Sequence, residues 1–482
     1  MSFAMWRLRG ALLPAFLPCI LAGCATQEYT KPALDMPAAW KVEAPWRVGQ
    51  PSDTAPKGPW WQRFGDAQLN ALQERAVAGS PTLAIAGARL AQSRAIVDAA
   101  SAGRYPQLGF GVRDARATIS ANRPLNNNNA PNFTTTQNDY VVSLSASYEA
   151  DLSGRVESSI AGAVASAEQS AADFENVRLV LTADLATAYF NLRAIDVELD
   201  VLARAIALQR RSLGIAQTRR ELGAASGLDV AQPQALLDST LTQVDLLRRQ
   251  RAQFEHAIAT LTGTPAPQFA LAPQINALAP PSIPLGLPSD LLERRPDVAS
   301  AERAMAAANA QVGVATAAFY PSILLGGTYG SESRLLATLF ATPSTIWSLG
   351  YTLAQTLFDA GRTRANVAGA KAGYEATVAN YRRVVLTAMQ EAEDGIIGAA
   401  ALERAHTQAQ VAVTSAARVL ELATVRYEGG IATTLDVIFA QQGLLNSERL
   451  AAQLLGQRLL TSVFLIKALG GDWEGPSKMA KQ

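Results

Sequence analysis

Histidine and cysteine are scarce in this chain, which has two of each among its 482 residues. Both cysteines, Cys19 and Cys24, stand close to the start, so a disulfide framework is not expected. His256 and His406 lie far apart without a neighbouring ligand set, a pattern that disfavours a metal site. The sequence also lacks a P-loop, an HExxH motif and a nucleophile elbow. We therefore expect neither an enzyme nor a bound cofactor.

An excess of charge of one sign is missing as well. The chain has 42 basic and 41 acidic residues, which gives a formal net charge of +1. This balance does not favour nucleic acid as a partner. Beyond the N-terminal segment, no window offers about 18 uninterrupted apolar residues, so no transmembrane helix is predicted.

The first residues have the pattern of a signal peptide. Arg7 and Arg9 precede a short apolar stretch at 11–21, which prolines interrupt and which is too short to span a bilayer. Leu-Ala-Gly-Cys at 21–24 resembles the bacterial lipobox, after which cleavage leaves Cys24 as a lipidated, palmitate-bearing N-terminus. An ordinary secretory signal with a chance cysteine is the alternative. Ala25 stands where an aspartate would resemble an inner-membrane retention signal, and this favours the outer membrane.

The chain is internally repeated. Residues 80–108 align without gaps with residues 295–323, so that Pro81 matches Pro296. Further on, GLDV at 227–230 matches TLDV at 434–437. The offset is 207 there and 215 in the first match, because the first copy carries extra residues in between. The predicted segments are a lipoprotein signal peptide at 1–23, a lipidated N-terminal segment at 24–65, a first repeat at 66–263, a Pro-rich linker at 264–289, a second repeat at 290–471 and a C-terminal tail at 472–482.

Each copy begins with a helix followed by strands. A helical stretch, about 66–104 and then 290–318, ends at Tyr-Pro, because the residue before proline avoids the α region. Residues 140–152 and 346–358 alternate between apolar and polar side chains, which predicts strand in each copy. One hairpin in each copy would give four strands per chain. The polar, Asn-rich tract at 123–137 predicts a loop.

Long helical hairpins complete each copy. Proline-free stretches rich in alanine, leucine and arginine at about 155–222 and 361–428 predict two very long helices. A Gly-containing turn then leads into a shorter helix, about 228–262 and 433–470. A helix of about 68 residues is roughly 100 Å long, too long for a compact domain. The fold class is therefore mainly α with a small β part, built from long α-helical hairpins and four strands per chain. Four strands are fewer than the roughly eight that a membrane barrel needs, so several chains must share one.

Three segments carry a resemblance to a known family. Residues 291–325, 59–95 and 423–437 resemble the signature segments of the outer-membrane factors, the TolC/OprM-like channels of tripartite efflux and type I secretion, and the lipobox points to the NodT-type lipoprotein branch. The resemblance implies a homotrimer in which a 12-stranded outer-membrane β-barrel continues into a periplasmic α-barrel. It also implies a periplasmic adaptor (membrane fusion) protein and a proton-driven inner-membrane pump of the RND type as partners, besides outer-membrane lipid. The chain itself would be a passive duct for small molecules such as drugs.

The same resemblance implies a periplasmic gate at the two helical turns. Asp229 and Tyr427 match an interhelical hydrogen-bond position, and Asp436 matches a ring of acidic residues in the pore. Phe439 stands one turn deeper, where relatives place an aspartate, which suggests an apolar constriction.

The two turns also contain small residues with an implied role, and their aspartates have a simpler alternative interpretation. Gly223 and Gly430 match the tip residues against which the adaptor packs. Ser226 and Thr433 each precede an aspartate by three residues, which is the spacing of a helix capping box, so caps alone would explain both acids. Phe439 fits equally well as a packed residue between helices.

Two other functions compete with the duct. A lipid-tethered helical scaffold that bridges outer membrane and cell wall would need the long helices but not the alternating strands. A periplasmic hydrolase would need a convergent acid, base and nucleophile, for which the sequence offers no candidate set.

Overall fold

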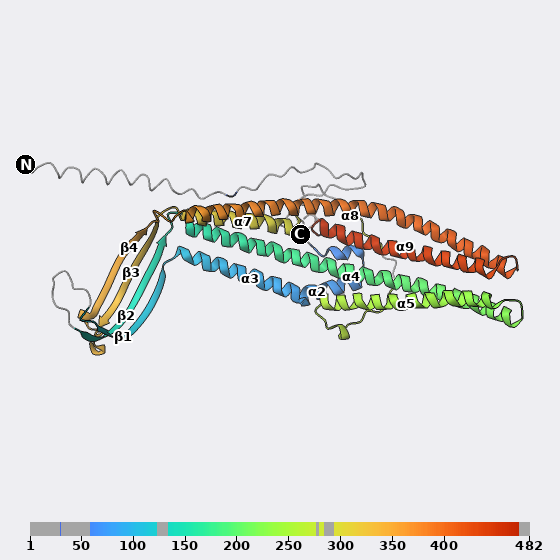
Figure 1. Cartoon of the computed structure of the whole chain (residues 1–482), viewed down its shortest axis with the longest axis horizontal. Helices are drawn as coiled ribbons and strands as arrows, with labels where there is room; N and C mark the ends of the chain where they lie inside the picture. Colours follow the sequence, from blue (N-terminus) through green and yellow to red (C-terminus); the bar gives the residue numbers. More distant parts are fainter. Residues whose placement is uncertain (1–28, 30–57, 123–133, 276–278, 284–293, 472–482) are drawn as a thin grey trace, which may run out of the picture. The chain divides into compact units, whose positions relative to one another are not determined.

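The computed structural model describes residues 29, 58–122, 134–275, 279–283 and 294–471 (Figure 1). The predicted signal peptide, Cys24 and the tail at 472–482 lie outside the described residues. Two compact units are present. Unit 1 comprises Met1–Pro32, Ala91–Gln169 and Glu302–Asn380, and unit 2 comprises Ala33–Leu90, Ser170–Ala301 and Tyr381–Gln482. In the described part of the chain, no helix has the length and apolar character needed to cross a membrane.

The predicted order of elements recurs in both halves of the chain. The first half has α2 (Ala67–Gly79), α3 (Pro81–Ser101), β1 (Gln107–Ile119), β2 (Thr135–Ala150), α4 (Arg155–Glu221) and α5 (Gly227–Leu261). The second half has α7 (Pro296–Ala317), β3 (Ser322–Ser333), β4 (Thr345–Ala354), α8 (Arg362–Glu428) and α9 (Thr434–Ala468). The fold is thus mainly helical, internally duplicated and supplied with four strands, as predicted.

Two details of the prediction were wrong. The helix expected over 66–104 is divided between α2 and α3, because Pro81 lacks an N–H and begins a new helix at its first position. The loop expected over 123–137 is too long at its end, because residues 135–137 already belong to β2. There Thr136 and Gln137 pair with Thr118 and Ala117 of β1, so polar side chains are accommodated on an exposed strand.

The four strands of unit 1 form one antiparallel sheet in the order β1-β2-β3-β4. Each half contributes one hairpin, and β2 pairs with β3 to join the halves. Residues directly opposite each other in an antiparallel pair lie on the same face. The register therefore shows which side chains share a face across the whole sheet.

One face of the sheet is apolar and exposed, and the other carries small polar residues. The apolar face contains the row Phe110–Leu144–Tyr329–Trp347, in which every side chain is more than half exposed. The opposite face contains the row Gly109–Ser145–Thr328–Ser348. An exposed apolar face of this extent is unusual for a surface in contact with water.

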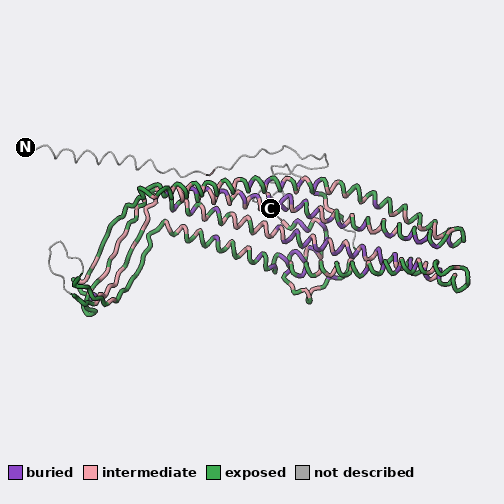
Figure 2. Tube along the Cα trace, viewed as in Figure 1, coloured by how far each residue is buried: buried purple, intermediate pink, exposed green. Residues whose placement is uncertain are grey.

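Unit 2 holds the main hydrophobic core. Its centre is a cluster of buried aromatic and aliphatic side chains that includes Trp60, Tyr189, Phe190, Ile258 and Leu465. Buried residues, shown in purple, gather on the α4 and α9 parts of this unit (Figure 2). The hydroxyl of Tyr189 donates to Asp66 at 2.6 Å, while Asp66 also caps α2. Burial, and then this hydrogen bond, raise the pKa of Tyr189, so the hydroxyl stays protonated and keeps donating.

A buried network of charges fixes the Pro-rich linker to the helices. The carboxylate of Asp196 accepts from Arg193 at 2.7 Å and from Arg251 at 2.6 Å. Arg193 also donates to the carbonyl of Ala272, and Arg251 to the carbonyl of Leu271. Because these carbonyls belong to the linker, the charges supply the hydrogen bonds that its backbone cannot find in a helix or sheet.

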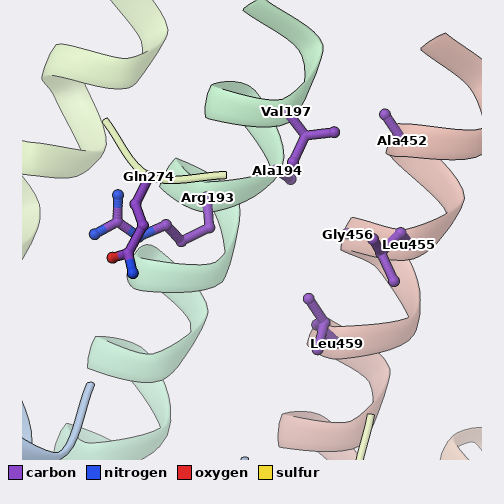
Figure 3. A pocket seen from close by; sticks show the side chains of 8 residues that line it. All are labelled: Arg193, Ala194, Val197, Gln274, Ala452, Leu455, Gly456 and Leu459. Atoms are coloured by element: carbon purple, nitrogen blue, oxygen red, sulfur yellow. The ribbon is translucent and has the colours of Figure 1, made fainter. Parts of the chain in front are cut away.

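Helices α4 and α9 approach each other closely at Gly456. In Figure 3, Ala194 of α4 faces Gly456 of α9, whereas Arg193 points the other way, beside Gln274. A Cβ atom built on Gly456 would lie 2.7 Å from the Cβ of Ala194, and the cavity here measures only about 10 Å³. Glycine is therefore required by packing at this position.

Substituting this glycine is expected to destabilise unit 2. Gly456→Ala should lower the free energy of unfolding by about 1–3 kcal/mol, because the added methyl group overpacks the contact with Ala194. Gly443→Ala on the same helix is the control. A Cβ there meets no atom within 4 Å, so the helix should gain about 0.5–1 kcal/mol. Thermal unfolding followed by circular dichroism should move in opposite directions, and equal shifts would contradict the close contact.

Candidate functional site

The two helical turns at Gly223 and Gly430 have the same backbone structure. Both glycines have φ +75°, the left-handed conformation that favours glycine. The N–H of Gly223 donates to the carbonyl oxygen of Arg220, and the N–H of Ala224 to that of Arg219. In the second turn, Gly430 and Ile431 donate in the same way to the carbonyl oxygens of Tyr427 and Arg426. This pair of bonds is the Schellman arrangement that ends a helix. Both glycines are exposed and a Cβ built on either would meet no atom within 4 Å, so the turns offer open surface.

Each turn is followed by a helix whose first residues form a capping box. The backbone N–H and the hydroxyl of Ser226 donate to Asp229 at 2.8 and 2.7 Å. Thr433 donates to Asp436 through the same two groups at the same two distances. These hydrogen bonds, the hydroxyl first, lower the pKa of both carboxyl groups. The structure therefore shows both aspartates as members of helix capping boxes, and their role in a gate stays a prediction.

Tyr427 joins the two turns within one chain. Its side chain is buried, and its hydroxyl accepts from Thr434 at 3.3 Å. The guanidinium of Arg219, at the end of α4, lies 4.2 Å from the centre of the Tyr427 ring. Arg219 also donates to the carbonyl oxygen of Tyr427 at 3.4 Å. A cation over an aromatic face is an attractive contact, and here it connects the α4–α5 turn with the α8–α9 turn.

The structure brings together only some of the residues that the sequence assigned to the gate. Within one chain, Asp229 bonds to Ser226 and not to Tyr427, whose contact from the other hairpin is Arg219. Asp436 and Phe439 are neighbours at i and i+3 on α9, and both are exposed while the intervening Val437 and Ile438 are buried. Their side chains are thus available to groups outside the chain.

Sequence reasoning missed Arg219. A basic residue in the last turn of a helix is explained by the helix dipole, so the sequence gives no reason to single out Arg219. The internal repeat held a signal, because Arg219 precedes Gly223 by four residues as Arg426 precedes Gly430. The repeat does not tell which of the two arginines contacts Tyr427, since that depends on how the two hairpins pack.

The histidines do not form a metal site. Within the described ranges, no group of three or more histidine, cysteine, aspartate or glutamate side chains is placed to hold a metal ion. His406 lies 3.2 Å from a guanidinium nitrogen of Arg458. Burial, followed by the charge of Arg458, lowers the pKa of His406.

Known proteins match this chain over nearly its whole length. The family model described as "Outer membrane efflux protein" matches residues 72–264 and 287–471. The pyoverdine export outer membrane protein OpmQ of Pseudomonas aeruginosa is 32% identical over 459 residues, which cover 95% of this chain and 96% of OpmQ. The toluene efflux pump outer membrane protein TtgF of Pseudomonas putida is 31% identical over 473 residues, covering 96% of both chains. The crystal structure of the Campylobacter jejuni CmeC outer membrane channel matches with a TM-score of 0.85 at 25% identity, covering 93% of this chain and 95% of CmeC.

Proposed function

Because the chain belongs to the outer membrane efflux protein family, we propose that it is the exit duct of a tripartite efflux system. Its location is the outer membrane, with a large periplasmic part. In the proposal the duct is a passive homotrimer without chemistry of its own. A periplasmic adaptor opens it, and an inner-membrane pump of the RND type, driven by protons, supplies the energy.

The sheet of unit 1 is the observation that carries a barrel shared between chains, whereas the number of three chains is what the resemblance to the outer-membrane factors implies. Within the described residues, β1 and β4 each pair with one strand only and so form the two edges of the sheet. Unpaired edge groups are very costly in lipid, so a membrane sheet must close on itself. Four strands are too few for closure, but three copies supply 12 strands when β4 of one chain pairs with β1 of the next.

The two faces of the sheet fit the two environments of such a barrel. The exposed row from Phe110 to Trp347 would face the lipid, and the row from Gly109 to Ser348 would face the lumen. Small residues on the inner face leave the pore open to its cargo. Relatives of nearly equal identity are named for pyoverdine and for toluene. We therefore assign small organic molecules, such as drugs, as the cargo class and leave selection to the pump and adaptor.

The helical turns are the proposed gate and docking point. Asp229, Tyr427, Asp436 and Phe439 close the periplasmic end, while Gly223 and Gly430 leave room for the helices of the adaptor. Three Asp436 side chains facing one axis would repel each other, which would raise their pKa against the lowering effect of the Thr433 bonds. The lipid on Cys24 is an accessory anchor in this proposal, because a closed barrel already holds the trimer in the membrane.

A pair of neighbouring substitutions in β4 tests the proposal. Leu349→Arg places a charge on the lipid face and should cost about 2–4 kcal/mol per chain near the middle of the bilayer, which would deplete trimers from the outer membrane. Ser348→Arg places the same charge on the lumen face. It should assemble normally and shift the anion-to-cation selectivity of the pore.

Membrane fractionation, native electrophoresis and planar-bilayer recordings of the full chain measure these effects. Both positions are exposed in the single chain, so a helical scaffold bridging outer membrane and cell wall would tolerate both changes equally. Equal trimer yields together with no conductance from the wild-type protein would favour that scaffold over the duct.

A further inference from the structure

Tyr29 is the one residue of the first 57 that the structure describes, and it lies against two helices of unit 1. Its side chain is half-buried and its hydroxyl is buried. Tyr29 forms one wall of a cavity of about 260 Å³, whose other walls are the beginning of α4 and the second half of α7. An aromatic side chain from the N-terminal segment is thus held at a defined place.

Small residues create the room for this aromatic ring. The helix walls of the cavity include Ala161 and Ala165 on α4 and Ala306, Ala310 and Gly313 on α7. The two helices approach closely, since a Cβ built on Gly313 would lie 2.7 Å from the hydroxyl of Ser158. A stripe of small residues leaves a shallow groove beside such a contact, and here Tyr29 covers it.

The groove lies close to the two central strands. Ser158 stands at the start of α4, which follows β2, and Gly313 stands near the end of α7, which precedes β3 (Figure 1). Cys24 precedes Tyr29 by five positions. A fully extended chain spans at most about 3.6 Å per residue, so Cys24 stays within about 18 Å of Tyr29 whatever path the chain takes.

From this placement we propose that Tyr29 is a docking residue that fixes the lipidated N-terminus beside the periplasmic ends of β2 and β3. The inference rests on the proposed function, because it takes the sheet to lie in the outer membrane and Cys24 to carry lipid. The acyl chains then enter the periplasmic leaflet next to the strands of their own protomer. Through the docked Tyr29, the lipid holds these strands at the membrane surface before the barrel closes. The effective concentration of the strands of different chains near each other is thereby raised, which speeds assembly. The finished trimer no longer needs this contact.

Cross-linking tests the docking itself. In the full-length protein, a short bismaleimide should join Tyr29→Cys to Ala310→Cys within one chain, because both residues line the cavity. Cys24 does not compete for the reagent, since its acylated sulfur is not a free thiol. Tyr29→Cys combined with Ser333→Cys is the control and should not be joined, because Ser333 ends β3 about 36 Å along the strand from Ser322, near which α7 ends. Equal cross-linking of the two pairs would overturn the docking site.

Assembly kinetics test the role of the docked residue. In pulse-labelled cells, Tyr29→Ala should form trimers several-fold more slowly than the wild type, whereas Tyr29→Phe should keep the wild-type rate because the ring is retained. Both variants should carry the same lipid on Cys24 by mass spectrometry and the same final conductance. Assembly of Tyr29→Ala at the wild-type rate would overturn the proposal. A wild-type chain without lipid on Cys24 would overturn the anchoring role, and trimers without conductance would instead overturn the proposed duct.

Discussion

Arg219→Ala is expected to convert a mostly closed channel into one that is open for much of the time. The substitution removes the guanidinium that lies 4.2 Å from the Tyr427 ring and the bond to the Tyr427 carbonyl. For a buried ring and a half-exposed cation, such a contact contributes about 1 kcal/mol. In the proposed trimer, three contacts that break together amount to about 3 kcal/mol, which corresponds to a change of about 100-fold in the ratio of open to closed channels.

Single-channel recordings in planar bilayers measure this ratio. Arg220→Ala is the matched control, since it removes the same charge from the next, exposed position of α4 without touching Tyr427. It should keep the wild-type pattern of small, brief openings. Arg219→Lys should lie between the two, because an ammonium group keeps the charge but lacks the planar surface that stacks on the ring. If Arg219→Ala and Arg220→Ala gate alike, the contact does not hold the turns together.

The long elements could be predicted from the sequence because local signals determine them. The helix predicted over 155–222 is observed as Arg155–Glu221, since no proline interrupts it and the Gly223 turn ends it. The caps at Asp229 and Asp436 follow from a three-residue spacing that any helix start can use. The division at Pro81 could not be predicted in this way. A proline can interrupt a helix or stand at the first position of a new one, and the sequence is compatible with either.

Contacts between distant residues could not be predicted in the same way. Arg219 and Tyr427 are 208 positions apart, and they meet only because α4 and α8 bring their ends together. The pairing of β2 with β3 joins the two halves in a similar manner. Alternation predicted which residues of a strand share a face, but not which strand lies beside it. For the same reason the sequence could not reveal that Asp196 lies between two arginines from different helices.

Asp196→Ala should be among the most destabilising single changes in the helical part. The Asp196 side chain is fully buried, and its partners Arg193 and Arg251 are 3% and 13% exposed. Removing the carboxylate leaves two guanidinium groups close together with little access to water. Loss of one partner from a buried ion pair costs about 3–5 kcal/mol, and here the charge of Arg193 loses its carboxylate while Arg251 keeps its ion pair with Glu255 at 3.2 Å. The linker should loosen as well, since Asp196 also accepts from the backbone N–H of Gln274 at 3.2 Å.

The exposed pair of Asp245 and Arg248 on α5 provides the control for this effect. Its side chains are 80% and 69% exposed and 3.4 Å apart, so Asp245→Ala should change stability by at most about 0.5 kcal/mol. The temperature at which the proposed trimers dissociate and lose helical circular dichroism should fall clearly for Asp196→Ala and stay unchanged for Asp245→Ala. Limited proteolysis should cut the first variant within the linker near Leu271 before the helices unfold. If both variants unfold at the same temperature, water must reach the arginines, and the network would contribute no more than a surface ion pair.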